Sequence, residues 1–577
     1  MGVHSVAVRV HVLSTLVDAF LTQYYARHPV NATFTGVHAH DGRLPDWSRA
    51  ARLQDADEMR TLHEALTTAH PTSHLPPEAY AAALNADVDL LDAELARANL
   101  EVRLAEFESG FFHDRNPALW TGEAIFGAAS LMIRPFASCN DRLPSLTARL
   151  AAIDDFLQVM RTTLQSAIPV PWIDRARKEC RAAMVLFDEG LALWLTEEPC
   201  DHERVIAVRI AAGHARDAFA ACERWLAQLP QSADASLACG AALYDVLLRR
   251  GHFSTHSATD LLVQATQELA TEQAALARML SHRGWTLADA QQAMAADHPT
   301  AAQYENSFHR RWAECRALAL QHDIVTWPEW PIRYVAIPPW ARASAPSLYW
   351  LFYRSPAPFD AYTTCEYLVT PIDDVLDAHE QEQRLRVWNF SAITLNHVVH
   401  HGAIGHHVQN WHAIHRGRSR LGQIAAVDCA SRISMFFGGT MAEGWACYAT
   451  GLMEELGLLT DLERVSEQHT RVRLLARAIA DVQLHTGAHS LAETIQFYVT
   501  EVGMPLETAT AEANKNSMFP CTAVMYWLGT RGIRNLRARM HARDGSNFVP
   551  RTFHDDVLSR GAIPVALVAA MMEASVT

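Results

Sequence analysis

Prolines constrain the fold of this chain more than any other feature of its sequence. Eight of the 25 prolines fall within residues 327–371, and a proline inside a helix removes a backbone hydrogen bond and clashes with the preceding turn. Short β-prone runs lie between these prolines, at 332–337, 348–353 and 365–370. The segment is therefore predicted to form a small antiparallel sheet near residues 332–370.

Helical patterns dominate the sequence on both sides of this segment. Apolar residues recur at helical spacing over residues 14–28, and residues 145–322 are rich in alanine and leucine with few glycines, which favours helices. Neither a fixed-period repeat nor a long linker divides the chain. We expect a mainly α fold in one continuous body, residues 1–577. Residues 1–326 should be mostly helical, and residues 327–577 should hold the sheet and a set of histidine-bearing helices.

Composition and charge exclude several classes of protein. Hydrophobic residues make up 49% and charged residues 20% of the chain, as in globular rather than disordered proteins. The net charge of −15 argues against a nucleic-acid partner, and no apolar run is long enough to predict a membrane span. The N-terminus lacks a signal-peptide pattern, and the ten cysteines form no CxxC pair. We expect a reduced, cytoplasmic protein with no membrane partner, and a homodimer is compatible with the sequence.

Seven of the 30 histidines fall between residues 397 and 415. A helical face that begins near Phe390 reaches His397, His400 and His401. Imidazoles on a buried face are costly unless they are hydrogen-bonded or coordinated, and imidazole is the commonest metal ligand among side chains. The pattern therefore favours a metal site, and the alternative is a histidine-rich helix that faces solvent.

One metal ion cannot bind all of these histidines if they lie on an unbroken helix. His406 and His407 would lie about 9–10 Å further along an ideal helix than His400. A bulge or break is needed, and we expect it at Gly405, because glycine weakens a helix. Such a break would turn His406 or His407 back toward His400.

A second segment, residues 441–458, offers a carboxylate. Glu443 is expected at the start of a helix whose Trp445, Tyr448 and Leu452 form an apolar stripe. Metallohydrolases often combine two histidines from one helix with a glutamate from another and leave a position open for water. The alternative is an acidic residue that only favours the positive end of its helix.

Several segments, in the same order, resemble the DUF885 family across nearly the whole chain. These segments are ATFTGVHAHDGRLPDWS (32–48), YLVTPIDD (367–374), HHGAIGHHVQ (400–409), EGWACYA (443–449), VQLHTGAHSLAETIQF (482–497), MYWLG (525–529) and FHDDVLSRGAIPVALV (553–568). Members of this family look like helical zincin metallopeptidases, similar to the carboxypeptidase Taq class. The resemblance implies a zincin-like body and one divalent metal ion, with zinc first and iron or manganese as alternatives.

The chain departs from the family pattern at the residue that matters most for hydrolysis. The family carries a His-Glu pair where this chain has His400 and His401, and in zincins that glutamate is the general base. The ligand-like residues remain, and they are His400, His406, His407 and Glu443. We rank His400, His406 and Glu443 first, with His407 hydrogen-bonding beside them. His401 is either a substitute base or an added ligand, and an added ligand would also suit iron, copper or manganese.

Two downstream segments supply candidates for handling the substrate. Arg473, Arg477, Asp481 and His485 share a helix face and could bind a substrate carboxylate or an oxyanion. Tyr526 could donate a hydrogen bond to a tetrahedral oxyanion. The alternatives are a salt-bridged surface stripe and a core tyrosine. The residues with expected catalytic roles are thus His401, His485, Tyr526 and Arg477.

Three functions fit these residues. The first is a metal-dependent hydrolase of a peptide or other amide bond in a small molecule or short peptide, with the strand at 365–370 lining the cleft. The second is a non-hydrolytic metalloenzyme acting on a small molecule in specialised metabolism, because the glutamate base is lost and histidines are added. The third is a catalytically inactive binding protein on the same scaffold.

Overall fold

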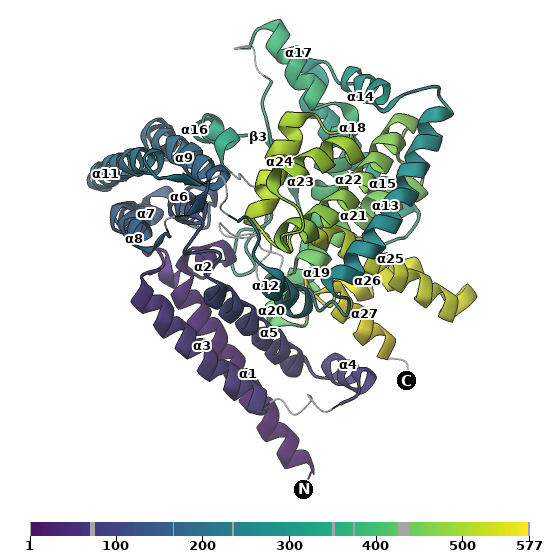
Figure 1. Ribbon diagram of the computed structural model, residues 1–577, viewed down its shortest axis with the longest axis horizontal. Helices are drawn as coiled ribbons and strands as arrows, with labels where there is room; N and C mark the ends of the chain where they lie inside the picture. Colours follow the sequence, from purple (N-terminus) through teal and green to yellow (C-terminus); the bar gives the residue numbers. More distant parts are fainter. Residues whose placement is uncertain are drawn as a thin grey trace.

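The computed structural model is mainly helical, as the sequence predicted (Figure 1). It describes residues 2–69, 75–165, 167–232, 236–348, 352–372, 376–424 and 438–574. The larger of two hydrophobic clusters among the described residues runs from Leu13 in the first helix to Met572 in the last. The N-terminal and C-terminal helices therefore share one core.

The N-terminal helices form a slanted bundle at one end of the molecule (Figure 1). Its elements are α1 (Gly2–Arg27), α2 (Pro29–Thr35), η1 (His38–His40), α3 (Arg49–Ala69), α4 (Pro77–Ala86) and α5 (Val88–Ser109). Helices α1, α3 and α5 pack on one another. Helix α2 ends at Gly36, whose φ of +87° suits glycine. A Cβ at Gly36 would lie 2.8 Å from the backbone nitrogen of Asp360, so this turn fits tightly against a distant loop.

A second helical layer follows the bundle. Its elements are α6 (Pro117–Ile133), α7 (Cys139–Ala151), α8 (Ile153–Thr163), α9 (Val170–Val185), η3 (Leu186–Gly190), α10 (Leu191–Trp194) and α11 (His202–Ala227). The next two elements, α12 (Ala241–Val246) and η4 (Leu247–Gly251), pack on α5 of the bundle instead. Helix α11 packs on α7 and α9, and α6 packs on α9. Two short strands, β1 (Ile168–Pro169) and β2 (Gln231–Ser232), pair in parallel at its side.

The remaining helices form the larger body on the right of Figure 1. Those before the histidine-rich segment are α13 (Ala258–Ser281), α14 (Leu287–Ala296), η5 (Ala301–Gln303), α15 (Tyr304–Gln321), α17 (Ala378–Val387) and α18 (Phe390–Ala392). The others are η7 (Ile393–Gly402), α19 (His406–Arg416), α20 (Arg420–Ile424), α21 (Gly439–Glu455), α22 (Asp461–His485), α23 (Leu491–Phe497), η9 (Tyr498–Val502), α24 (Leu506–Met518), α25 (Val524–Asp544), η10 (Gly545–Asn547), α26 (Pro550–Leu558) and α27 (Val565–Ala574).

Helices α21, α22 and α25 of this body lie around the functional residues. Helix α21 packs on both α25 and η7, and α22 packs on α13 and α25. Helix α22 begins at a capping box, in which Thr460 and Glu463 satisfy each other's backbone N–H groups. The start of α22, and with it the register of its inward-facing residues, is therefore defined by local hydrogen bonds.

The proline-rich segment forms a small sheet, but its topology differs from the expectation. Strands β3 (Ile332–Ala336), β5 (Cys365–Val369) and β4 (Tyr353–Arg354) lie in the order β3-β5-β4. The sheet is mixed, because β4 pairs with β5 antiparallel whereas β3 pairs with β5 in parallel. The chain makes a crossover through α16 (Pro339–Arg342), η6 (Ala345–Ser347) and β4 before β5 returns beside β3. Part of the predicted run 348–353 lies outside the described residues.

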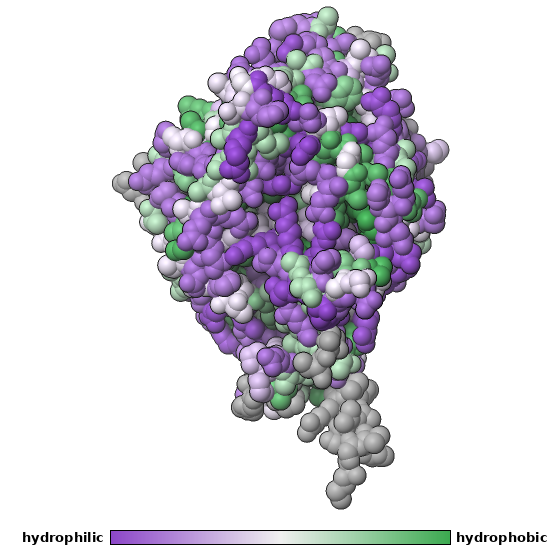
Figure 2. Space-filling model, turned by 90° about the vertical axis from the view of Figure 1, so that its right-hand side faces the viewer, coloured by the Kyte–Doolittle hydropathy of each residue, from purple (hydrophilic) through white to green (hydrophobic). Residues whose placement is uncertain are grey.

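The face of the molecule seen in Figure 2 is mostly polar. Figure 2 shows hydrophilic side chains over most of the face turned toward the viewer, apolar groups gathered toward one edge, and a hollow near the middle. Within the described ranges, no helix combines the length and apolar character needed to cross a bilayer.

Candidate metal centre

The helix that carries the histidines breaks where the sequence predicted. Element η7 is a π-helix that ends at Gly402, and α19 begins at His406. Between them the backbone turns at Ala403 (φ −123°, ψ −115°) and Gly405 (φ −72°, ψ −118°). A Cβ at Gly405 would overlap the carbonyl group of His400, so only glycine permits so close an approach. The break brings His406 back to His400.

Three imidazoles meet at this break. One ring nitrogen from each of His400, His401 and His406 lies within 4.8 Å of those of the other two. The ring centroids of His400 and His406 are 4.9 Å apart, and those of His401 and His406 are 5.2 Å apart. The cluster is therefore compact enough for one ion to be shared by its members.

Glu443 joins this cluster from α21. Its Oε2 atom lies 3.2 Å from Nε2 of His400 and 3.6 Å from Nε2 of His406. Helix α21 begins at Gly439, so Glu443 lies in the second turn and not at the start as expected. It is also buried. An end-of-helix charge therefore does not account for this carboxylate.

The separations within the cluster match those of ligands around one ion. Zinc binds histidine nitrogen and carboxylate oxygen at about 2.0–2.2 Å, so two tetrahedral ligands lie roughly 3.3 Å apart. The two distances from Glu443, 3.2 and 3.6 Å, are close to that value. His400, His406 and Glu443 therefore fit a divalent ion, and a ring nitrogen of His401 lies within 4.8 Å of those of His400 and His406.

The protonation of the cluster also suits a cation. Burial lowers the pKa of His400, against the opposing effect of its hydrogen bond with Glu443. Burial lowers the pKa of His401 well below its usual value, and the charges of His400 and His406 add to this. Burial alone would raise the pKa of Glu443, but the charge on His406 and hydrogen bonds from both histidines hold it well below its usual range. Neutral imidazole and ionised carboxylate are the forms that bind metal.

His401 has a defined tautomer. Its Nδ1 atom lies 2.6 Å from the carbonyl oxygen of Asn396, and a carbonyl can only accept, so Nδ1 carries the proton and donates it. The lone pair is therefore on Nε2. That atom can accept a proton or bind a metal ion, and both roles predicted for His401 stay open.

The cluster forms part of the wall of a cavity of about 400 Å³. Among the predicted residues, Arg473, Arg477 and Tyr526 line it together with His400, His401 and Glu443. Arg477 forms an ion pair with Glu512 at 2.8 Å, and its guanidinium lies over the ring of Tyr526 at 4.5 Å from the centroid. Helices α21, α22 and α25 thus bring these side chains to one space.

Three histidines that the sequence highlighted lie away from the cluster. His407 is fully buried and turns to the sheet, with Nδ1 3.3 Å from the hydroxyl of Tyr353, and burial lowers its pKa to about 4. The metal role predicted for His407 therefore does not match its position. The ring of His397 stacks on that of Trp388, with the two centroids 4.3 Å apart. His397 therefore packs against a tryptophan and does not belong to the metal cluster.

His485 is also remote from the cavity lining. It is fully buried, and its Nε2 lies 2.9 Å from the carbonyl oxygen of Asn516. Asp481 of the same helix face accepts hydrogen bonds from the backbone nitrogens of Cys521 and Val524. The C-terminal end of the predicted face on α22 therefore holds the loop before α25. The catalytic role predicted for His485 does not match its position.

Other cavity residues were not predicted. Cys447 lies one turn after Glu443, and its Sγ is 3.9 Å from Nδ1 of His400. The i, i+4 spacing of Glu443 and Cys447 could have indicated this residue, because such pairs share a helix face. Arg531 and Arg534 of α25 also line the cavity, and their role depends on how α25 packs.

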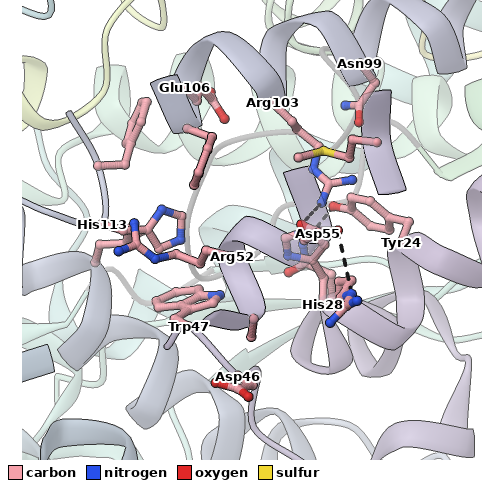
Figure 3. Close-up of a pocket in the computed structure, with 17 residues that line it drawn as sticks. Tyr24, His28, Asp46, Trp47, Arg52, Asp55, Asn99, Arg103, Glu106 and His113 are labelled. Carbon is pink, nitrogen blue, oxygen red and sulfur yellow. Dashed lines mark hydrogen bonds and ion pairs between the residues drawn. The ribbon is translucent and has the colours of Figure 1, made fainter. Parts of the chain in front are cut away.

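A second, smaller cavity of about 100 Å³ lies in the N-terminal bundle (Figure 3). Figure 3 shows Trp47 on one wall, Arg52 and His113 on one side, and Arg103 with Asp55 on the other. Its arginines pair with acids: Arg103 with Asp55 at 2.9 Å, Arg52 with Asp114 at 2.7 Å and Arg27 with Glu58 at 2.8 Å. It shares no lining residue with the larger cavity.

Comparison with known proteins identifies the family. Residues 29–572 match the family described as "Bacterial protein of unknown function (DUF885)". Two solved structures are similar in fold. A "putative lipoprotein of unknown function" from Shewanella oneidensis has a TM-score of 0.74 and 19% identity, with 97% of this chain and 99% of that chain covered. A "putative lipoprotein" from Colwellia psychrerythraea has a TM-score of 0.76 and 17% identity, with 98% of each chain covered. No curated protein matches. The chain belongs to the DUF885 family.

Proposed function

We propose that this protein is a metal-dependent hydrolase that cleaves a peptide or other amide bond in a small substrate. The observation that carries the proposal is the convergence of three imidazoles and a buried carboxylate in one cluster, of which His400, His401 and Glu443 line a cavity. The cavity, at about 400 Å³, has the size of sites that hold small molecules. Its lining combines metal-ligating groups with arginines, which suits an anionic amide.

His400, His406 and Glu443 would hold the ion, with zinc as the first choice and iron or manganese as alternatives. A divalent ion in such a site polarises a carbonyl group and lowers the pKa of water toward 7. The side chains also determine how the ion is presented. The close approach at Gly405 holds His400 and His406 together, and α21 holds Glu443 against both.

His401 is the proposed general base. Its Nδ1–H is held by the carbonyl of Asn396 at 2.6 Å, which leaves Nε2 to accept a proton from the attacking water. The resulting imidazolium can return that proton to the departing amine nitrogen. This gives His401 the role of the glutamate in the resembling zincins.

Arg477 and Tyr526 are the proposed partners of the developing oxyanion. Arg477 lies over the ring of Tyr526 at 4.5 Å, a cation–π contact that orients the phenol. The hydroxyl group of Tyr526 can donate a hydrogen bond to the carbonyl oxygen as it becomes negative. His485 has no part in this proposal, because it contacts Asn516 instead.

A second candidate function is supported by the same cluster. All three imidazoles, His401 included, offer a nitrogen within 4.8 Å of the others. If His401 binds the ion, the site has four protein ligands and no separate base. Such a centre suits non-hydrolytic chemistry on a small molecule, with iron, manganese or copper as the metal.

Metal content and turnover test the proposal together. The protein, purified without chelator or nickel resin, should contain about one zinc per chain by mass spectrometry and should cleave N-acyl amino acids or dipeptides. His400→Ala and His406→Ala should each lose metal and activity. The matched control is His415→Ala, which removes an exposed histidine of the same segment. Metal retained in both cluster variants, or a metal-free native protein, would refute the site.

The location of the protein in the cell is a separate question, with the cytoplasm and the cell envelope as the two alternatives. A cytoplasmic protein is the expectation from the cysteine pattern, whereas the two similar structures are described as lipoproteins, which points to the cell envelope. Fractionation of cells that express the full gene, followed by immunoblotting, distinguishes the two. Recovery with the envelope fraction would rule out the cytoplasmic expectation.

A further inference from the structure

Five arginines line the cavity beside the histidine cluster, and they are Arg471, Arg473, Arg477, Arg531 and Arg534. Three come from α22 and two from α25, helices that pack on each other. A guanidinium is always charged and suits carboxylates, because its N–H groups match their two oxygens. The use of each arginine therefore bears on what the cavity binds.

Three of the five are already engaged within the protein. Arg477 pairs with Glu512 at 2.8 Å, and Arg471 pairs with Glu454 at 2.5 Å. Arg531 donates to the side-chain oxygen of Gln264. In contrast, Arg473 and Arg534 form neither a hydrogen bond nor an ion pair with any residue that the structure describes. These two guanidiniums are available to a ligand.

The guanidinium groups of Arg473 and Arg534 lie at different positions along the axis of α21. Arg473 lines the cavity together with His400, His401 and Glu443, and its charge adds to the effect of burial in lowering the pKa of His400, so Arg473 lies near the histidine cluster. Arg534 lies further along, where its Nη2 is 3.1 Å from the position of a Cβ on Gly451. Gly451 is four residues after Cys447, whose Sγ lies 3.9 Å from Nδ1 of His400, or about 6 Å along the helix axis. The glycine leaves room for this guanidinium beside the helix.

Glu467 also lines this cavity, and the charge of Arg534 acts on it. Its Oε1 accepts hydrogen bonds from the hydroxyl of Thr450 at 3.1 Å and from Nε of Arg471 at 3.2 Å. Its charge acts on Arg534, but the two form no ion pair within 4.0 Å. Glu467 thus accepts hydrogen bonds from residues of α21 and α22. The N–H groups of Arg534 remain available to donate to a ligand.

We propose that the substrate of this cavity carries two carboxylates, one bound by Arg473 beside the histidine cluster and a second by Arg534 further along α21. This inference rests on the proposed function in one respect, namely that the bond cleaved is an amide bond. The substrate class is an N-acylated acidic amino acid or a dipeptide that ends in one. The first carboxylate places the amide at the cluster, and the second selects the acidic side chain.

A pair of probes that differ in one carboxylate tests this inference without relying on turnover. N-acetylglutamate and N-acetylglutamine have nearly the same shape, and calorimetric titration measures the affinity of each, with product analysis of the same samples. We expect N-acetylglutamate to bind at least about tenfold more tightly, the gain from one charge-assisted pair. Arg534→Gln should bring the ratio close to one, and Arg473→Gln should weaken both probes.

The control variant is Arg537→Gln, which lies on the same helix but outside the cavity lining and pairs with Glu455 at 2.9 Å. It should keep the full discrimination. Equal affinities in the native protein, discrimination that survives Arg534→Gln, or binding of neither probe would overturn the inference. Discrimination without cleavage would refute only the proposed hydrolysis, and cleavage without discrimination would refute only the second carboxylate.

Discussion

The two cavities of this protein use the same residue types in opposite ways. In the N-terminal cavity, Arg27 and Arg103 both contact Asp55, at 3.7 and 2.9 Å, and Arg52 pairs with Asp114. In the cavity between α21, α22 and α25, the charges of Arg473 and Arg534 have no ion pair within the described part of the chain. The larger cavity also borders the histidine cluster, in which one ring nitrogen of each imidazole lies within 4.8 Å of the others.

This difference separates charges that hold the fold from charges that await a ligand. Paired, partly buried charges link helices, and removal of one partner leaves the other uncompensated. Open charges contribute little to folding and cost free energy to keep near apolar walls, so they indicate selection for binding. Substitutions in the larger cavity should therefore change metal binding and turnover, whereas substitutions in the smaller cavity should change stability.

The largest effect is expected from His401→Glu. If His401 is the base, a carboxylate at the same place should take over the proton transfer from water to the leaving amine, so hydrolysis should continue with a changed rate and pH profile, whereas loss of any base would cost about 10²–10⁴-fold. Metal content should stay constant. The measurement is kcat/KM on a dipeptide panel together with metal analysis. A change in metal identity or affinity would instead favour His401 as a ligand, and no change in metal, rate or pH profile would exclude both roles.

Glu443→Ala tests the metal site itself. This substitution removes a ligand that lies within 3.6 Å of two imidazole nitrogens. Loss of a group that merely supports a ligand costs roughly 10–100-fold in metal affinity, and loss of a ligand should cost at least the upper value. Competition with a chelating dye measures the affinity. Asp55→Asn in the smaller cavity is the control and should leave it unchanged. Full metal occupancy in Glu443→Ala would remove Glu443 from the site.

The break at Gly405 and the second helix with Glu443 could be predicted from sequence, because both follow from spacing. His406 cannot reach His400 along a straight helix, and only glycine allows the chain to fold back so tightly. Sequence reasoning ranks His406 ahead of His407, but spacing alone does not decide which of the two faces the cluster. Neighbouring residues on a helix point about 100° apart, and the dihedral angles at Ala403 and Gly405 select His406.

Packing between distant helices limited the rest of the prediction. The helical parts were recognisable from their periodicity, whereas the parallel pairing of β3 with β5 depends on a crossover that local patterns do not encode. Arg534 belongs to α25 and reaches the cavity only because α25 packs on α21. His485 shared a predicted face with Arg477, but the loop before α25 covers that end of α22.

Asp55→Ala should remove the ion pairs that Asp55 makes in the smaller cavity and lower stability without changing metal binding. It leaves Arg27 and Arg103 without this carboxylate, and the side chain of Arg103 is only 9% exposed. The free energy of unfolding should fall by about 1–3 kcal/mol, between the values for exposed and buried pairs. Urea denaturation measures it. Asp57→Ala on the same helix is the control, since Asp57 is 80% exposed and should cost less than about 1 kcal/mol. Equal losses would show that the pairing at Asp55 is not structural.

The smallest effect concerns pH and the paired charges around His38. Its Nδ1 and Nε2 each lie 2.8 Å from a carboxylate, of Asp41 and Asp360 respectively. Burial lowers the pKa of His38, but the hydrogen bonds and charges of the two aspartates outweigh this and raise it to about 9. The protonated ring thus bridges η1 to the loop that contacts Gly36.

The sign of the pH effect follows from this shift. The folded-state pKa of His38, about 9, is above the usual value of 6.5, so the folded state holds the proton more tightly than the unfolded state. The stabilisation is fully present below pH 6.5 and is lost as the pH rises through 9. The free energy of unfolding should therefore fall between pH 6.5 and 9 in the native protein, and His38→Gln should flatten this part of the profile. Urea denaturation at pH 6 and pH 9.5 compares the two proteins. A fall of the same size in His38→Gln would assign the dependence to other groups and remove His38 from the set of structural charge pairs.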